Sequence, residues 1–130
     1  MTSILKALGY LWAAPTTILC LIFFLFPMWA LGQITPFRWS DGAWDWVIVQ
    51  DGWFWKLYTL RGWAASTLGW AIFYSPGYVN QPKFSTHERR HVLQNLILGP
   101  TFILIYLVFN IAFSYQDNPL EVDARNHEQA

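Results

Sequence analysis

The sequence Thr86-His87-Glu88-Arg89-Arg90-His91-Val92-Leu93-Gln94 decides how the rest of the chain is interpreted. It contains two histidines four residues apart, with a glutamate directly after the first. On a helix, this spacing puts the imidazoles of His87 and His91 on one face. Two neutral imidazoles placed in this way can bind one zinc ion, and Glu88 can hold and deprotonate a water molecule beside it. The stretch therefore predicts a zinc site on a helix, and such a site needs at least one more ligand.

The overall composition indicates a membrane protein. Of 130 residues, 55% are hydrophobic, only 12% are charged, and nine are tryptophan. Such a balance is unusual for a soluble domain. The formal net charge is zero and no basic face interleaved with aromatic residues stands out, so no nucleic-acid partner is expected. The single cysteine, Cys20, excludes a disulfide within the chain.

Residues 1–32 are predicted to form a transmembrane anchor. The run from Ile4 to Leu31 is apolar, with Lys6 as its only charge. At ~1.5 Å per residue, a helix of this length can cross a hydrocarbon layer of ~30 Å. The run is too long for the apolar region of a typical cleaved signal peptide. One domain, residues 33–130, is expected to follow the anchor.

A small antiparallel sheet rich in tryptophan is predicted after the anchor. Residues 46–50 and 53–58 are expected to pair as a hairpin across Asp51-Gly52, a favoured turn sequence. A further strand is predicted from Thr67 to Phe73. If this strand lies at the sheet edge beside the metal helix, it would pair with an extended peptide substrate. The alternative is that it is an ordinary strand of the sheet that only packs on the helix. The candidate substrate-strand residues are Thr67, Leu68, Gly69, Trp70 and Ala71.

Two helices are predicted around the break at Gly99-Pro100. The metal helix is expected over residues 86–98, and an apolar helix over residues 101–115. If the chain reverses at the break, the second helix brings the C-terminal segment back beside the two histidines. If the chain continues straight, residues 96–113 form a second membrane span.

The segment after the apolar helix offers candidates for the third metal ligand. Asn118-Pro119 is a strong helix-start signal, and it places Glu121 at the third helical position. There Glu121 can act as a zinc ligand if the chain reverses, or it can serve only a capping box. Asp117 and Asp123 are close alternatives as ligands. Gln94, one turn further along the metal helix, can support a metal ligand through a hydrogen bond or pack the helix, and packing is the favoured interpretation.

Three blocks of the C-terminal half resemble a family of small bacterial membrane-associated proteins with a zincin-like, that is zinc-peptidase-like, core. The resemblance implies a gluzincin-like site, with His87, His91 and Glu121 as metal ligands and Glu88 as the base. Relatives often have a histidine where this chain has Trp70, so the role of that position does not carry over. The blocks are Thr67-Leu68-Gly69-Trp70-Ala71-Ile72, His87 to Gln94 with Leu98-Gly99-Pro100, and Asn118-Pro119-Leu120-Glu121-Val122-Asp123-Ala124.

Taken together, these features predict a membrane-anchored zinc metallopeptidase of α+β fold that hydrolyses peptide bonds. The alternative is a non-catalytic subunit that packs in a larger membrane complex, such as a respiratory or photosynthetic one, and a metal-binding accessory protein without hydrolysis lies between the two. The expected partners are the lipid bilayer, a peptide substrate and other membrane subunits. Because most Lys and Arg residues lie between the two apolar runs, residues 33–95 are expected on the cytoplasmic side of a bacterial inner membrane.

Overall fold

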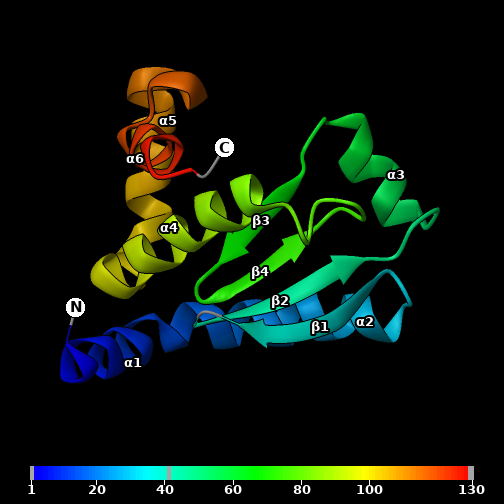
Figure 1. Cartoon of the computed structure of the whole chain (residues 1–130), viewed down its shortest axis with the longest axis horizontal. Coiled ribbons are helices and arrows are strands. Elements are labelled where there is room, and N and C mark those ends of the chain that lie inside the picture. Colours follow the sequence, from blue (N-terminus) through cyan, green and yellow to red (C-terminus); the bar gives the residue numbers. More distant parts are fainter. Residues whose placement is uncertain (1, 41, 129–130) are drawn as a thin grey trace.

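The computed structural model describes residues 2–40 and 42–128 and has a mixed α+β fold (Figure 1). A four-stranded sheet has the strand order β1-β2-β4-β3. Helices cover both faces of this sheet, so the chain forms three layers. The elements are α1 (Ser3–Cys20), a π-helical turn (Leu21–Leu25), α2 (Phe26–Ala30), β1 (Ile34–Ser40), β2 (Ala43–Ile48), α3 (Trp53–Leu60), β3 (Ala65–Leu68), β4 (Ala71–Tyr74), α4 (Pro82–Leu98), α5 (Thr101–Asp117) and α6 (Pro119–Asn126).

The two faces of the sheet are buried against different helices. Trp46 on β2 packs against Leu21 and Leu25, which lie on the N-terminal helical segment. On the opposite face, Ile72 on β4 packs against Val92 of α4. The alternation of side chains along each strand separates these two cores. Helix α4, which carries the two motif histidines, is thereby held over one face of the sheet, next to β3.

The predicted hairpin of residues 46–50 and 53–58 is wrong, because the second segment forms helix α3. Phe54 and Tyr58, one helical turn apart, both pack on Phe73 of β4, and this four-residue spacing suits a helix rather than a strand. The Gln33 side chain accepts a hydrogen bond from the Phe54 N–H at 3.2 Å, which satisfies one donor at the start of the helix. The Asp51-Gly52 turn therefore leads into a helix.

The sheet is mixed, whereas an antiparallel sheet was predicted. β1 and β2 pair antiparallel, and so do β3 and β4, but β2 and β4 pair in parallel. The chain reaches the parallel position because α3 lies in the crossover between β2 and β4. The prediction missed this crossover because it treated residues 53–58 as a strand.

The predicted strand from Thr67 to Phe73 is two strands joined by a tight turn. Thr67 and Leu68 lie in the edge strand β3, Gly69 and Trp70 form the turn, and Ala71 lies in the inner strand β4. Gly69 has φ of 66°, a conformation that glycine adopts without steric cost. The turn contacts α1, because the backbone N–H of Trp70 donates a hydrogen bond to the Thr17 hydroxyl at 3.1 Å.

The N-terminal helical segment is both apolar and part of the protein core. Over Ser3–Ala30 it is 28 residues long, and among the described residues it is the one helix long and apolar enough to cross a membrane. One face carries the core residues Ala13, Leu21, Leu25 and Met28. The other face exposes apolar side chains along its whole length: Ile4, Leu8, Leu11, Ile18, Ile22, Phe26 and Trp29.

Replacing Leu25 with alanine is expected to lower the free energy of unfolding by ~2–5 kcal/mol, because the side chain is fully buried and its loss leaves a cavity. Leu19→Ala is the matched control on the same helix, and the Leu19 side chain is 55% exposed. The control is expected to change stability by less than ~0.5 kcal/mol. Chemical unfolding in detergent, followed by tryptophan fluorescence, measures both. Equal effects of the two changes would contradict the packing of this helix on the sheet.

The chain bends sharply between α4 and α5, and the bend brings the C-terminal segment back to the metal helix. The two helix axes differ by 116°, and Gly99 at the break has φ of 59°. Asn118 then caps α6, accepting a hydrogen bond from the Leu120 N–H at 2.9 Å, which confirms the predicted helix start. α6 packs against α4. Of the two predicted courses, the structure has the one that returns, and it excludes a straight span over residues 96–113.

The limits of the two predicted helices differ modestly from the structure. α4 begins at Pro82, four residues before the predicted start at Thr86, because proline is well suited to the first helical position. α5 extends to Asp117 but contains a break in helical geometry at Ser114. The short segment after this break re-enters the site described below.

Candidate metal centre

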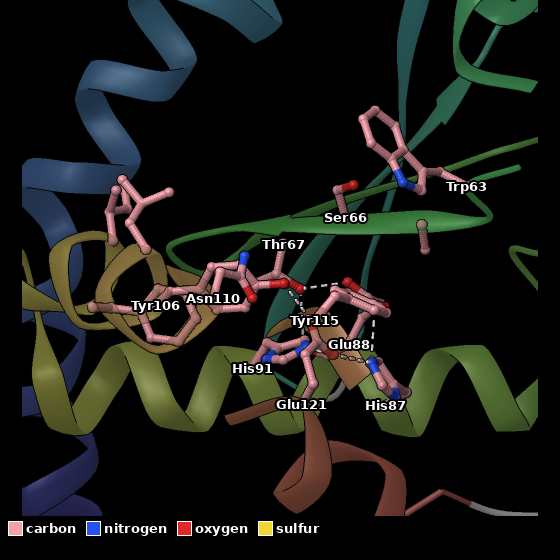
Figure 2. Close-up of a pocket in the computed structure, with 14 residues that line it drawn as sticks. Trp63, Ser66, Thr67, His87, Glu88, His91, Tyr106, Asn110, Tyr115 and Glu121 are labelled. Carbon is pink, nitrogen blue, oxygen red and sulfur yellow. Dashed lines mark hydrogen bonds and ion pairs between the residues drawn. The ribbon is translucent and has the colours of Figure 1, made fainter. Parts of the chain in front are cut away.

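Helix α4 presents both histidines of the motif to one side, as its four-residue spacing predicts. The imidazole ring centres of His87 and His91 are 5.0 Å apart. His91 is buried and His87 is partly buried. Figure 2 shows both rings directed toward the same cavity, together with side chains from β3, α5 and α6.

Helix α6 brings Glu121 to both histidines. The Glu121 Oε1 atom lies 3.0 Å from the Nε2 atom of His87 and 3.0 Å from that of His91. Its second oxygen accepts a hydrogen bond from the Tyr106 hydroxyl of α5. Both carboxylate oxygens are thus engaged in the site and not in a capping box.

The alternative ligands lie elsewhere. Asp123 is directed to Arg90, with its two oxygens 2.7 Å and 3.1 Å from guanidinium nitrogens. Asp117 is exposed at the end of α5. Of the three acidic candidates, the structure brings only Glu121 to the two imidazoles.

The tautomer of His91 follows from its neighbour Gln94. The Gln94 amide nitrogen donates to the Leu120 carbonyl at 3.0 Å and to Asp123 at 2.8 Å. The amide oxygen of Gln94 is therefore the atom that faces His91 Nδ1, at 2.8 Å, and it can only accept. His91 Nδ1 must carry a hydrogen, which leaves Nε2 to act as a ligand. Gln94 thus orients the His91 imidazole through a hydrogen bond and does not serve helix packing alone.

His87 is oriented in the same way by a carboxylate. Glu128 Oε1 lies 2.7 Å from His87 Nδ1, and a carboxylate at this distance accepts a hydrogen bond from the imidazole. His87 Nε2 is then turned to the cavity. An imidazole held by a carboxylate on one nitrogen while the other faces a metal is a recurrent arrangement in metal sites, and it makes the imidazole a more basic ligand.

The donor set and its spacing fit a zinc ion. Two imidazoles and one carboxylate form a common ligand set of catalytic zinc sites, in which a fourth position is left for water. Ligand atoms arranged tetrahedrally at ~2.1 Å from zinc lie ~3.4 Å from one another. The 3.0 Å distances from Glu121 to His87 and His91 need to widen by only a few tenths of an ångström.

Glu88 lies beside this set of ligands. Ligand atoms of His87, Glu88 and His91 all lie within 4.8 Å of one another, so Glu88 can also reach an ion. Glu121 is nevertheless the better placed candidate for the third ligand, because it is 3.0 Å from both imidazoles, whereas Glu88 Oε2 is 3.7 Å from His87 Nε2. The other Glu88 oxygen accepts a hydrogen bond from the Thr67 hydroxyl of β3 at 2.9 Å.

The pKa values of His87, His91 and Glu121 depend on one another. Burial by itself would lower the pKa of His87 and His91, but their hydrogen bonds to Glu121 and the charge of Glu88 outweigh it and raise both pKa values. Burial opposes ionisation of Glu121 as well, yet its hydrogen bonds from the two imidazoles lower its pKa well below the ordinary value. The geometry is that of one carboxylate oxygen shared by the Nε2 atoms of two imidazoles.

The environment of Glu88 differs from that of Glu121. Burial raises the pKa of Glu88, against the opposing effects of His91, His87 and Thr67. A carboxylate with a raised pKa is suited to take up a proton and release it again near neutral pH. The pKa values of the two glutamates in this site are thus shifted in opposite directions, that of Glu88 upward and that of Glu121 downward.

The site opens into a cavity of about 390 Å³. Its polar end is formed by the two histidines and the two glutamates. Its apolar wall comes from the loop before β3 and from α5: Trp63, Phe102, Ile103 and Leu107. A cavity with one polar end and an apolar wall is suited to bind an apolar side chain next to a polar reacting group.

No protein family, curated protein or solved structure matches this chain significantly.

The candidate substrate-strand residues are only partly brought to the site. Thr67 lines the cavity, as do Ala65 and Ser66 on the same strand. Gly69 and Trp70 face α1 and its neighbourhood instead, and Ala71 is buried in the sheet. The sequence prediction placed the cavity strand about two residues too late, because it did not recognise the turn at Gly69-Trp70.

Sequence reasoning missed four residues around the site, namely Tyr106, Asn110, Tyr115 and Glu128. Tyr106 and Asn110 line the cavity and are spaced one turn apart within an otherwise apolar helix, so a polar stripe was available as a signal. Glu128 gave no signal, since it lies in a polar tail. Tyr115 gave none either, because its position depends on the break at Ser114.

Replacing Gln94 with leucine is expected to raise the dissociation constant for zinc by about 10–100-fold, because His91 loses the partner that fixes its tautomer and ring. Gln116→Leu, at an exposed position of α5, is the control and should bind zinc as the wild type does. Competition with a chromophoric zinc chelator gives both constants. Unchanged zinc affinity in Gln94→Leu would mean that the amide serves packing alone.

Proposed function

We propose that this protein is a membrane-bound zinc metallopeptidase. One observation carries the proposal: Glu121, 30 and 34 residues away in sequence, lies 3.0 Å from the Nε2 atoms of both motif histidines, with Glu88 beside them. His87, His91 and Glu121 are the proposed zinc ligands, and Glu88 is the proposed general base. An accidental His-Glu pattern on a helix would not require a distant carboxylate at this point.

In the proposed reaction, each residue of the site has a separate role. A zinc ion held by His87, His91 and Glu121 would polarise the scissile carbonyl and make a water molecule acidic enough to react near neutral pH. Glu88 accepts the proton of that water and passes it to the leaving amine. Thr67 holds one Glu88 oxygen, so the other remains directed toward His87 and the reacting water.

The edge strand β3 is suited to align a peptide. The Ser75 N–H donates to the Ala64 carbonyl at 2.8 Å. Because hydrogen-bonded positions alternate along an antiparallel ladder, Ala65 and Thr67 turn their backbone N–H and C=O groups toward the free edge. An extended peptide can add to this edge as a further strand, with its backbone beside the metal ligands.

The membrane is the proposed location of the enzyme. The exposed apolar face of α1 and α2 would contact lipid, while the opposite face packs on the sheet. Lys and Arg residues between the apolar runs support a cytoplasmic position for residues 33–95, at a bacterial inner membrane.

A second candidate function is that of a non-catalytic subunit in a larger membrane complex. The exposed side chains of α5 favour it, because they add a second apolar surface to that of α1: Leu104, Leu107, Val108 and Ile111. A subunit of this kind would need neither Glu88 nor a metal ion.

The direct test is hydrolysis of a fluorogenic peptide with apolar residues by zinc-loaded protein in detergent. The same assay is run on the Glu88→Gln variant at equal zinc content. Hydrolysis by the wild type alone supports the peptidase. A wild type that holds no zinc after metal supplementation would contradict the proposal and favour the structural subunit.

A further inference from the structure

The break in α5 at Ser114 is a strained feature next to the site. Ser114 has φ of 69° and ψ of 170°, inside a helix whose other residues are helical. This region is adopted almost only by glycine, and a residue held there costs ~1–3 kcal/mol. Strain of this kind persists only where the surrounding structure imposes it, and it is often found where a side chain must be aimed at a functional site.

The break changes the direction of the residue that follows it. Tyr106 and Asn110 of α5 face the cavity, one helical turn apart. Tyr115 is nine residues after Tyr106, and in an unbroken helix with ~100° per residue it would lie on the opposite face. In the structure, however, Tyr115 lines the same cavity (Figure 2). The non-helical conformation at Ser114 is what allows it to do so.

Tyr115 differs from the other hydroxyl-bearing residues of the cavity. The Ser66 hydroxyl is bonded to Tyr58, the Thr67 hydroxyl to Glu88, and the Tyr106 hydroxyl to Glu121. The Tyr115 hydroxyl makes no hydrogen bond with residues 2–40 or 42–128, and the side chain is 53% exposed. It is therefore the hydroxyl that remains free to donate to a molecule bound in the cavity.

We propose that Tyr115 is a catalytic residue that donates a hydrogen bond to the oxygen of the scissile carbonyl as negative charge develops on it. This inference rests on the proposed peptidase function. The hydroxyl keeps its proton throughout and forms no covalent bond, so the step is electrostatic stabilisation. Burial raises the pKa of Tyr115, so the phenol remains a donor at neutral pH.

The test compares Tyr115→Phe with wild type in three measurements. The variant is expected to bind about one zinc per chain as the wild type does, because Tyr115 contacts no proposed ligand by a hydrogen bond. Its kcat should fall by about 10²–10³-fold with little change in KM, the effect of removing one donor to a developing oxyanion. Its dissociation constant for a phosphonate analogue of an apolar dipeptide, whose tetrahedral phosphorus imitates the attacked carbonyl, should rise by more than about 10-fold.

Tyr78→Phe is the matched control, since Tyr78 packs on Phe84 and lies outside the cavity. It should leave all three measurements unchanged. Phosphonate affinity in Tyr115→Phe equal to that of wild type would overturn the inference while leaving the peptidase proposal intact. A zinc-loaded wild type that binds no phosphonate and cleaves no peptide would overturn both, and it would do so without reference to any Tyr115 variant.

Discussion

A Glu88→Gln variant is expected to retain about one zinc per chain and to lose peptide hydrolysis, with kcat lowered by about 10²–10⁴-fold. The amide keeps the size of the side chain and can still interact with the Thr67 hydroxyl. It cannot accept a proton at neutral pH, so the water is no longer activated by a base. Zinc should remain because the three proposed ligands are untouched.

The control for this change is Asp51→Asn, a carboxylate-to-amide replacement at an exposed position outside the site. It should leave both zinc content and kcat unchanged. Zinc content is measured by atomic emission on protein purified in detergent, and kcat with the fluorogenic peptide. Full activity in Glu88→Gln would show that Glu88 is not the base, whatever the metal content.

The second large effect is expected at Glu121. Glu121→Ala should raise the dissociation constant for zinc by more than ~100-fold, beyond the range expected for loss of an outer hydrogen-bond partner such as Gln94. The reason is that its Oε1 atom is shared by both imidazoles, and without it only two protein ligands remain. His91→Ala should have an effect of the same size.

Asp117→Ala provides the matched control, because it removes a nearby carboxylate that does not enter the site. It should leave zinc content at about one per chain. Asp123→Ala removes the partner of Arg90 and is expected to weaken zinc binding only through Gln94. Retention of zinc by Glu121→Ala together with its loss in Asp123→Ala would assign the third ligand to Asp123 and contradict the geometry.

The parts of the fold that sequence could predict are those set by local physical signals. The spacing of His87 and His91 fixes their common face on any helix, and Asn118-Pro119 starts a helix through a cap and a fixed φ. Gly99-Pro100 marked the break but not its angle. Whether the chain turns by 116° or continues depends on contacts with distant residues, such as the packing of α6 on α4.

The errors in the predicted sheet also arise from contacts with distant residues. Residues 53–58 have the aromatic composition of a strand, and their helical form is favoured by the packing of Phe54 and Tyr58 on Phe73, a contact across the fold. The turn at Gly69-Trp70 is stabilised by Thr17, more than fifty residues earlier. The helix at residues 53–58 and this turn are both determined by tertiary packing, which cannot be predicted from local propensity.

The site also combines residues that local sequence signals predict with residues that only the tertiary structure places. The motif on α4 and the helix that carries Glu121 were accessible from sequence, since each is encoded in a short segment. Glu128 and Tyr115 were not, because one reaches His87 from an unpatterned tail and the other reaches the cavity only through the strained Ser114. Residues of this kind are found only when the backbone path is known.

The N-terminal helical segment forms part of the same hydrophobic core as the sheet, and this has a practical consequence for producing the protein. Leu21, Leu25 and Met28 fill the core on one face of the sheet, and Ala13 contributes to the core on the other face, so this segment is not a detachable tether. Expression from residue 33 onward would uncover Trp46 and Ile48, which are fully buried in the intact chain. A soluble fragment suited to crystallisation is thus better sought by substituting polar residues on the outward side of α1 than by truncation.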